Sequence, residues 1–214
     1  MIMRLTSLCV KGLAALVLVA SLAGCFGKPP PPQRYLRVDL AEGPCPGQNS
    51  QQHRLPLGFK TLTALDNLDR TAVLTARDQV LTASLEYYWE GAPQDVVGRA
   101  LRQGIECESR TLTPVDYQPR VLHDAVLSGQ VTAFNVEETD GGRFVVSVHL
   151  DLWTKNLGAR VSSGDFNAYY PLDNFNGDTI AKAASNALGR IVPKVVEWLD
   201  SAEPRLEQAR QRRQ

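Results

Sequence analysis

Three histidines and four cysteines carry the most reactive side chains of this sequence. His149 lies in the stretch RFVVSVHLDLW, two residues before Asp151, and residues two apart in a strand share one face. Such a pair could act as a general acid and base. No nucleophile or third partner is evident from the pattern, so a solvated His–Asp neighbour on an open sheet is the favoured interpretation. We expect no catalytic residue, no cofactor and no enzyme activity.

Two other polar motifs have simpler interpretations than chemistry. SSGD at 162–165 lacks the strand–turn–helix setting of a nucleophile elbow. DNFNGD at 173–178 alternates Asp and Asn like a calcium loop but lacks the terminal glutamate, so helix capping by Asn176 or Asp178 is favoured. No Cys or His stands at the spacing of zinc ligands, and no metal site is expected.

Cys25 follows a short apolar segment with the layout of a secretory signal. Arg4 and Lys11 make the start of the chain basic, and residues 12–23 (GLAALVLVASLA) are almost wholly apolar. Such a segment is too short to cross a bilayer, which takes about 20 residues. A buried N-terminal helix is the alternative, but four prolines follow at once. We predict a signal peptide over residues 1–24.

The end of that segment, LAGC at 22–25, resembles the bacterial lipobox, in which the signal is cut just before the cysteine. The resemblance implies that Cys25 is the first mature residue and carries acyl chains as a membrane anchor. One chain holds a protein only marginally, whereas two or more hold it stably. Phe26 follows instead of the aspartate that marks inner-membrane retention. The resemblance therefore implies the outer membrane, with the domain on its periplasmic side.

Cys45 and Cys107 remain once Cys9, in the signal, and Cys25 are set aside. In an oxidising compartment a disulfide between them is the favoured interpretation, and two separate thiols are the alternative. The bond would close a loop of about 60 residues and stabilise the fold by about 4 kcal/mol in the chain-entropy model. It would fasten the polar loop over 41–54 to the domain.

Length and charge restrict the class of protein further. Removing residues 1–24 leaves 190 residues, enough for one domain with a sizeable core. The remaining 21 basic and 23 acidic residues nearly balance, and no basic face points to nucleic acid. The tail over 204–214 ends basic; a solvated helix end is favoured over a contact with anionic lipid or an acidic partner.

Periodicity predicts the order of the elements. Residues 25–34 form a stiff, proline-rich tether. Strands are expected at 35–40, 57–63, 71–78, 80–85 and 106–111, and an amphipathic helix at 93–105. Next comes a three-stranded meander in which alternating apolar residues mark a strand with one wet face. Its first strand has a bulge near Ala133, Asp140 and Gly141 turn into its second, and 159–170 is its third.

A second helix is predicted at 177–201, kinked or broken near Gly189 by Pro193 and ended by Pro204. The domain over 35–203 is therefore expected to be α+β, with two helices packed on one face of a mostly antiparallel sheet. Tyr87, Tyr88 and Trp89 form the one aromatic cluster. A core role for Trp89 is favoured there, and a protein interface is the alternative.

The order and spacing of several stretches resemble the ABC-type transport auxiliary lipoproteins, the PqiC/YmbA-like family. The stretches are LAGC followed by YLRVDL, NLDRTAVLTARD, Trp89 before DVVGRALRQGI, VLSGQVTAFNVEETDGGRFVVSVHLDLW, and AKAASNALGRIVPKVV. The segments around Cys45 and over 54–65 depart from the family pattern, as do the two extra cysteines.

The resemblance implies a function without catalysis. Such lipoproteins act beside a permease, an ATPase and an MCE-domain protein that together move lipids between membranes, and they can form ring-like homo-oligomers. The expected role is therefore an outer-membrane docking component of that transport system. A structural or assembly lipoprotein for envelope integrity is the alternative, and a hydrolase that uses His149 is a third, disfavoured reading.

Overall fold

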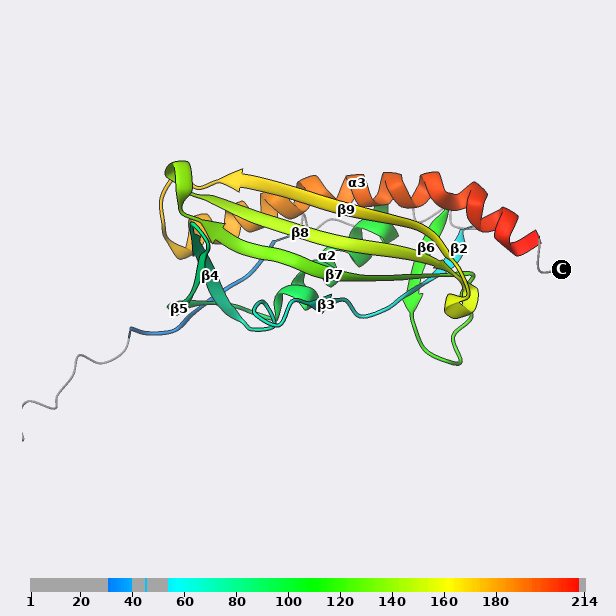
Figure 1. The fold of residues 1–214 in the computed structure, drawn as a ribbon, viewed down its shortest axis with the longest axis horizontal. Coiled ribbons are helices and arrows are strands. Elements are labelled where there is room, and N and C mark those ends of the chain that lie inside the picture. Colours follow the sequence, from blue (N-terminus) through cyan, green and yellow to red (C-terminus); the bar gives the residue numbers. More distant parts are fainter. Residues whose placement is uncertain (1–30, 40–44, 46–53, 212–214) are drawn as a thin grey trace, which may run out of the picture. The chain divides into compact units, whose positions relative to one another are not determined.

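A computed structural model of the chain describes residues 31–39, 45 and 54–211. The expected signal peptide, Cys25 and most of the expected tether lie outside the described residues. The chain divides into two compact units, Met1–Pro32 and Gln33–Gln214. The fold described below is that of the second unit (Figure 1).

Within the described ranges this unit is built from nine strands, two α-helices and two short 3-10 turns. The elements are, in order, β1 (Arg34–Leu36), β2 (Leu55–Phe59), β3 (Thr63–Ala64), β4 (Ala72–Arg77), β5 (Val80–Trp89), α2 (Pro93–Glu108), β6 (Leu112–Asp116), β7 (Ala125–Glu137), η2 (Thr139–Gly141), β8 (Arg143–Thr154), η3 (Lys155–Leu157), β9 (Arg160–Pro171) and α3 (Gly177–Gln211).

The sheet is organised around β7. Along one side β7 pairs antiparallel with β8, which pairs antiparallel with β9. Along its other side β7 pairs parallel with β2, then β3, then β4. Beyond these, β6 pairs parallel with β2, β5 antiparallel with β4, and β1 parallel with β5.

The α+β class is confirmed, but the sheet is mixed, and the expectation of a mostly antiparallel sheet was wrong. Alternation of apolar residues shows which face of a strand is buried, not the direction of its neighbour. Only the hairpin and meander connections leave a readable turn signature, while the crossovers that make strands parallel do not.

The meander matches its prediction closely. Buried positions of β8 alternate with partly exposed ones along its length: Phe144, Val146, Val148, Leu150 and Leu152 are all at most 1% exposed. The register of β7 against β8 shifts between Val131 and Ala133, so the predicted bulge is confirmed. The turn through η2 joins Glu137 to Arg143 as a hairpin.

Helix α2 is longer than its pattern suggested. It begins with Pro93 in its first turn and buries Val96, Val97, Leu101 and Ile105 against the sheet and α3. It continues to Glu108, so the strand expected at 106–111 was wrong, and the strand β6 starts at Leu112 instead. Glutamates suit a helix, and the amide of Ser109 closes its end by donating to the carbonyl of Ile105.

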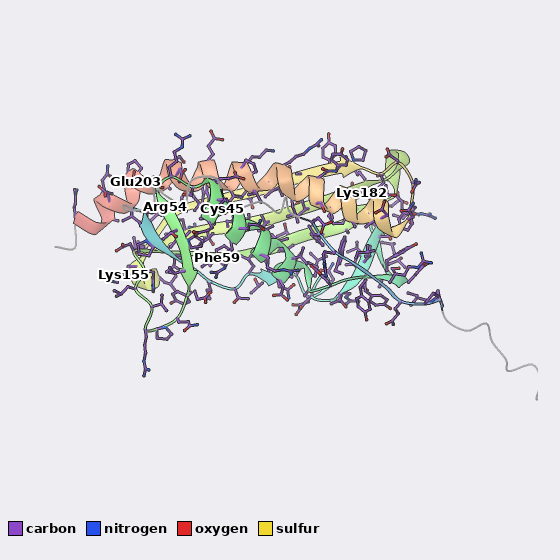
Figure 2. All side chains as sticks on the ribbon, turned by 180° about the vertical axis from the view of Figure 1, so that it is seen from behind. Cys45, Arg54, Phe59, Lys155, Lys182 and Glu203 are labelled. Atoms are coloured by element: carbon purple, nitrogen blue, oxygen red, sulfur yellow. A yellow bond between two sulfur atoms is a disulfide. The ribbon has the colours of Figure 1, made fainter. Side chains whose placement is uncertain are left out.

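Helix α3 runs without a break from Gly177 to Gln211, past both internal prolines. Of the predicted kink or break near Gly189, the break is therefore wrong, as is the expected end at Pro204. The apolar stripe of α3 continues through Val195 and Leu199 to Leu206, and this packing on β8 and β9 outweighs the two lost backbone bonds. Figure 2 shows its direction, with Lys182 near its start and Glu203 near its end.

The start of α3 is capped as expected. The side-chain oxygen of Asn176 accepts a hydrogen bond from the amide of Thr179 at 3.0 Å, and its carbonyl accepts one from the amide of Ile180. This is the geometry of an N-cap, which satisfies a donor that the first turn leaves unpaired. Asn176 thus caps the helix, as one of the two residues that the sequence favoured for this role.

The aromatic cluster of β5 is mostly part of the core. Trp89 is 1% exposed and its ring lies edge-on to Phe134 and Phe144, at centroid distances of 5.0 and 5.6 Å. The interface alternative is therefore wrong for Trp89, and the core role is correct. Tyr87 is half-buried and packs against the same core, while Tyr88 lies with its ring 5.9 Å from that of Tyr35.

Candidate functional site

The chain enters the domain through β1, beside the end of β5. Arg34, Tyr35 and Leu36 stand level with Tyr87, Tyr88 and Trp89 in a parallel pair. Leu36 is buried in the core, and the amide of Glu90 donates to its carbonyl at 3.0 Å. The strand that follows the expected tether is therefore held by both backbone pairing and an apolar anchor.

A charged clamp fixes the end of β1 to α2. The carboxylate of Glu90 accepts a hydrogen bond from Arg37 on one oxygen and from Arg99 on the other, each at 2.9 Å. Burial alone would raise the pKa of Glu90, but the hydrogen bonds and charges of the two arginines outweigh it and lower the pKa below its ordinary value of 4.5. The clamp thus links the entry strand to the helix layer through one carboxylate.

We expect Glu90→Gln to lower the free energy of unfolding at neutral pH by less than about 1 kcal/mol, because both arginines are largely exposed to water. The lowered pKa means that the ionised form stabilises the fold above the unfolded-state pKa, and that this contribution is lost as pH falls through the folded-state pKa. Urea unfolding of both proteins from neutral to acid pH measures it. If the difference in free energy of unfolding between the two proteins stayed constant below pH 4.5, the ionised carboxylate of Glu90 would not be its cause.

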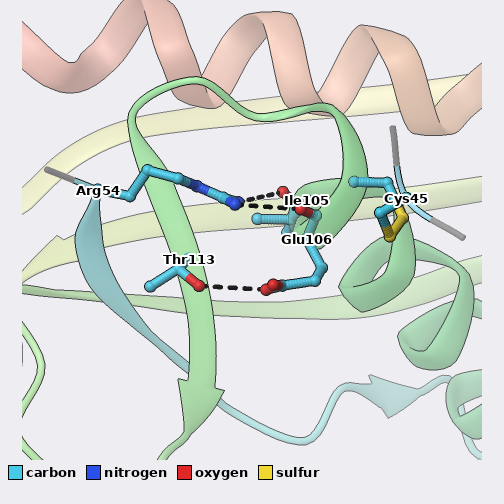
Figure 3. Close-up of a disulfide and its surroundings, with 6 residues drawn as sticks. Cys45, Arg54, Ile105, Glu106 and Thr113 are labelled. Atoms are coloured by element: carbon cyan, nitrogen blue, oxygen red, sulfur yellow. Dashed lines mark hydrogen bonds between the residues drawn. A yellow bond between two sulfur atoms is a disulfide. The ribbon is translucent and has the colours of Figure 1, made fainter. Parts of the chain in front are cut away.

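Cys45 and Cys107 form a disulfide, the pairing favoured from the sequence (Figure 3). Cys107 lies in the last turn of α2, and Arg54 reaches the same turn. The guanidinium of Arg54 donates to the carbonyls of Ile105 at 2.8 Å and Glu106 at 3.1 Å. A cation suits the carbonyl end of a helix. Cys45 and Arg54 are thus both attached to the end of α2. The side chain of Glu106, in the same turn, also accepts a hydrogen bond from the hydroxyl of Thr113.

His149 has more partners than its sequence neighbourhood suggested. Its Nδ1 lies 2.6 Å from a carboxylate oxygen of Asp165, and its Nε2 lies 3.3 Å from the hydroxyl of Ser163 and 3.7 Å from Asp151. The order Asp–His–Ser is that of a hydrolytic triad. Sequence reasoning missed Asp165 and Ser163, although the antiparallel register of the meander sets His149 opposite Asp165.

The surroundings of this trio do not suit catalysis. A triad aspartate works from a buried position where it orients the imidazole. Asp165 is 82% exposed at its side chain and His149 is 37% exposed, so water competes for every bond between them. Arg160 also reaches Asp151, at 3.2 Å. The arrangement is a solvated charge network on the wet face of the meander.

We expect the variant His149→Ala to fold and to restore the detergent resistance of a deletion strain as well as the wild type does, because the removed contacts are exposed. Complementation of a deletion strain by the variant, with a sensitivity test against detergent, measures this. Ser163→Ala serves as the paired variant. Loss of function in both variants, with unchanged abundance, would contradict the non-catalytic interpretation.

An open groove of about 510 Å³ lies between α2 and the segment after β2. Phe59, labelled in Figure 2, forms part of its wall. The guanidinium of Arg102 stands 5.2 Å from the centre of the Phe59 ring. Arg102 also pairs with Asp116 at 2.7 Å. The charge of Arg102 is thus paired within the groove.

No helix in the described part of the chain combines the length and the apolar character that spanning a membrane requires. The expected anchor, Cys25, lies outside the described residues.

Comparison with known proteins shows the fold. No family model and no curated protein matches the sequence. A crystal structure of a Xanthomonas campestris protein of the DUF330 family has a TM-score of 0.70 at 15% identity, covering 82% of this chain and 99% of that one. An uncharacterised protein has a TM-score of 0.63 at 15% identity, covering 78% and 99%.

A hypothetical protein of Chlamydia trachomatis has a TM-score of 0.51 at 8% identity, covering 70% of this chain and 97% of that one. These proteins are similar to this chain over nearly their full length. The α+β architecture is therefore that of an existing fold, shared at an identity too low to transfer function.

Proposed function

We propose that this protein is a lipoprotein, anchored in the outer membrane through Cys25 and acting in the periplasm without catalysis. The observation that carries this proposal is LAGC at 22–25, after a basic start and an apolar run, nine residues before β1 at Arg34. The similarity in fold to a DUF330 protein supports it, because it gives the domain an architecture consistent with the sequence resemblance. The exposed setting of His149 supports the non-catalytic part.

The finer role rests on the sequence resemblance. It is that of a docking component for an MCE-type transport system, in which a permease, an ATPase and an MCE-domain protein move lipids between membranes. A ring-like homo-oligomer belongs to the same proposal. A rigid single domain on a short tether suits docking, because it holds a binding surface near the membrane at little cost in conformational entropy.

Crosslinking at native expression, mild detergent extraction and affinity purification test the docking role. An MCE-domain protein is expected in the purified complex, and the variant Cys25→Ser serves as the control that removes the anchor. A clean failure to capture such a protein, in cells that contain one, would contradict the docking role. An envelope phenotype without that capture would favour the structural lipoprotein instead.

A further inference from the structure

Large apolar side chains are exposed at the end of the domain where the chain enters. Leu85 is 75% exposed, Val80 64% and Phe175 54%. Val80 and Leu85 belong to β5, and Phe175 lies in the turn before α3. We call these three residues the hairpin-end patch. Solvent-facing apolar groups gathered at one end of a domain mark a contact with another apolar phase.

Leu85 is presented by a defined backbone feature. The pairing of β4 with β5 jumps from Leu74–Ala83 to Ala72–Tyr88, so residues 84–87 form a wide bulge. The hydroxyl of Ser84 accepts hydrogen bonds from the amides of Glu86 at 3.1 Å and Tyr87 at 2.9 Å. These bonds replace the missing ladder bonds and fix the bulge. Leu85 therefore stands out from the sheet edge on an ordered backbone.

Two residues of the hairpin-end patch, Val80 and Phe175, border a groove that Leu85 does not line. Val80, Phe175, Val73 and Tyr87 line one shallow groove of about 470 Å³. Two ion pairs lie at its margin, Arg77 with Glu138 and, beside the bulge, Arg34 with Glu86 at 3.5 Å, and Asp78 also lines the groove. The two ion pairs neither attract nor repel a surface strongly, so the apolar groups dominate the contact.

The entry of the chain lies next to this patch. Arg34 stands level with Tyr87 in a parallel pair, so β1 begins beside the bulge that carries Leu85. Figure 1 shows β5 and the first described residues at the same end of the sheet. Eight residues separate Cys25 from Arg34, and a proline-rich chain spans at most about 28 Å over that length.

We propose that the hairpin-end patch inserts into the interfacial layer of the same bilayer leaflet that holds the acyl chains of Cys25. This inference rests on the proposed lipid anchoring. With an anchor only one short tether away, even a weak apolar contact is favoured, because the tether sets a high effective concentration of membrane. The patch then fixes the orientation of the domain and points its other end away from the membrane.

Site-directed spin labelling of the acylated protein in phosphatidylcholine vesicles tests the proposal. In Leu85→Cys the introduced thiol is the one available for labelling, since Cys45 and Cys107 are bonded and Cys25 is acylated. Leu122→Cys is the matched control: Leu122 is 79% exposed but precedes β7, whereas β4 and β5 lie by the end of β7. Flotation with the vesicles is measured first.

The nitroxide at position 85 is expected to collide several-fold more with oxygen than with a water-soluble nickel chelate, relative to position 122. Equal nickel access at both positions in protein that floats would overturn the patch and leave the anchor intact. A label at position 85 shielded from both reagents would also overturn it, indicating a contact with a second copy. Failure to float would remove the anchoring itself, and the inference with it.

Discussion

Trp89→Ala is expected to lower the free energy of unfolding by about 3–5 kcal/mol, which is the usual cost of truncating a buried large aromatic residue. Trp89 is 1% exposed and packs edge-on against Phe134 and Phe144, which pack against each other at 4.9 Å. Removing the indole opens a cavity among rings that cannot collapse into it, since each belongs to a hydrogen-bonded strand. Urea unfolding followed by circular dichroism measures the loss.

Trp89→Phe is the matched control for this prediction. The indole N–H of Trp89 is buried and has no hydrogen-bond partner among the described residues, so phenylalanine loses no bond there. We expect less than half of the effect of alanine, because an aromatic ring still fills most of the space. An alanine effect below about 1 kcal/mol would show that Trp89 is not in the core and would reopen an interface role.

Removal of the Cys45–Cys107 disulfide is the second large effect. The cysteines are 62 residues apart, and the chain-entropy model gives about 4 kcal/mol for a loop of that size. Such a loss is a large fraction of the stability of an ordinary domain, about 5–15 kcal/mol. The double variant Cys45→Ser, Cys107→Ser should therefore unfold at distinctly lower urea concentration than the wild type.

Reduced wild-type protein is the control, and it should match the double serine variant. The native sheet should persist in both, because Arg54 still binds the carbonyl end of α2 and the core does not involve the two cysteines. Unchanged stability in both samples would contradict a structural role for the bond. Loss of secondary structure before any denaturant is added would show a larger role than the entropy model gives.

The parts of the fold that sequence patterns predicted are those whose determinants are local. Buried and more exposed positions alternate along β8, and Asp140 and Gly141 are residues typical of the turn that precedes it. Asn176 caps the first turn of α3. Each of these is decided within a few residues of chain. The bulge at Ala133 was readable for the same reason, because it shifts the apolar phase along one strand.

The errors came from interactions between distant segments. Pro193 and Pro204 break a helix by local propensity, but the packing of α3 on β8 and β9 holds it together. Asp200 adds to this by accepting hydrogen bonds from Ser109 at 2.6 Å and Thr111 at 2.8 Å. The parallel pairs of the sheet leave no local pattern, so the mixed sheet could not be read from alternation.

The residues of the candidate site show the same difference between local patterns, which could be predicted, and contacts between distant segments, which could not. Cys45 and Cys107 could be paired by counting cysteines, and the location of Trp89 followed from its place before an amphipathic helix. Predicting the partners of His149 requires the register between β8 and β9, which a single sequence does not reveal. The exposure of Leu85 depends on a bulge that Ser84 stabilises. From the apolar strand pattern alone, Leu85 would be predicted to be buried.

Membrane fractionation of cells that express Cys25→Ser tests the central claim most directly. The wild-type protein is expected in the outer-membrane fraction and the variant in the soluble periplasmic fraction, because the acyl chains supply most of the membrane affinity. Mass spectrometry of the wild-type N-terminus should find an acylated cysteine at position 25. A variant that stays in the outer membrane as fully as the wild type would contradict the lipid anchor and the function built on it.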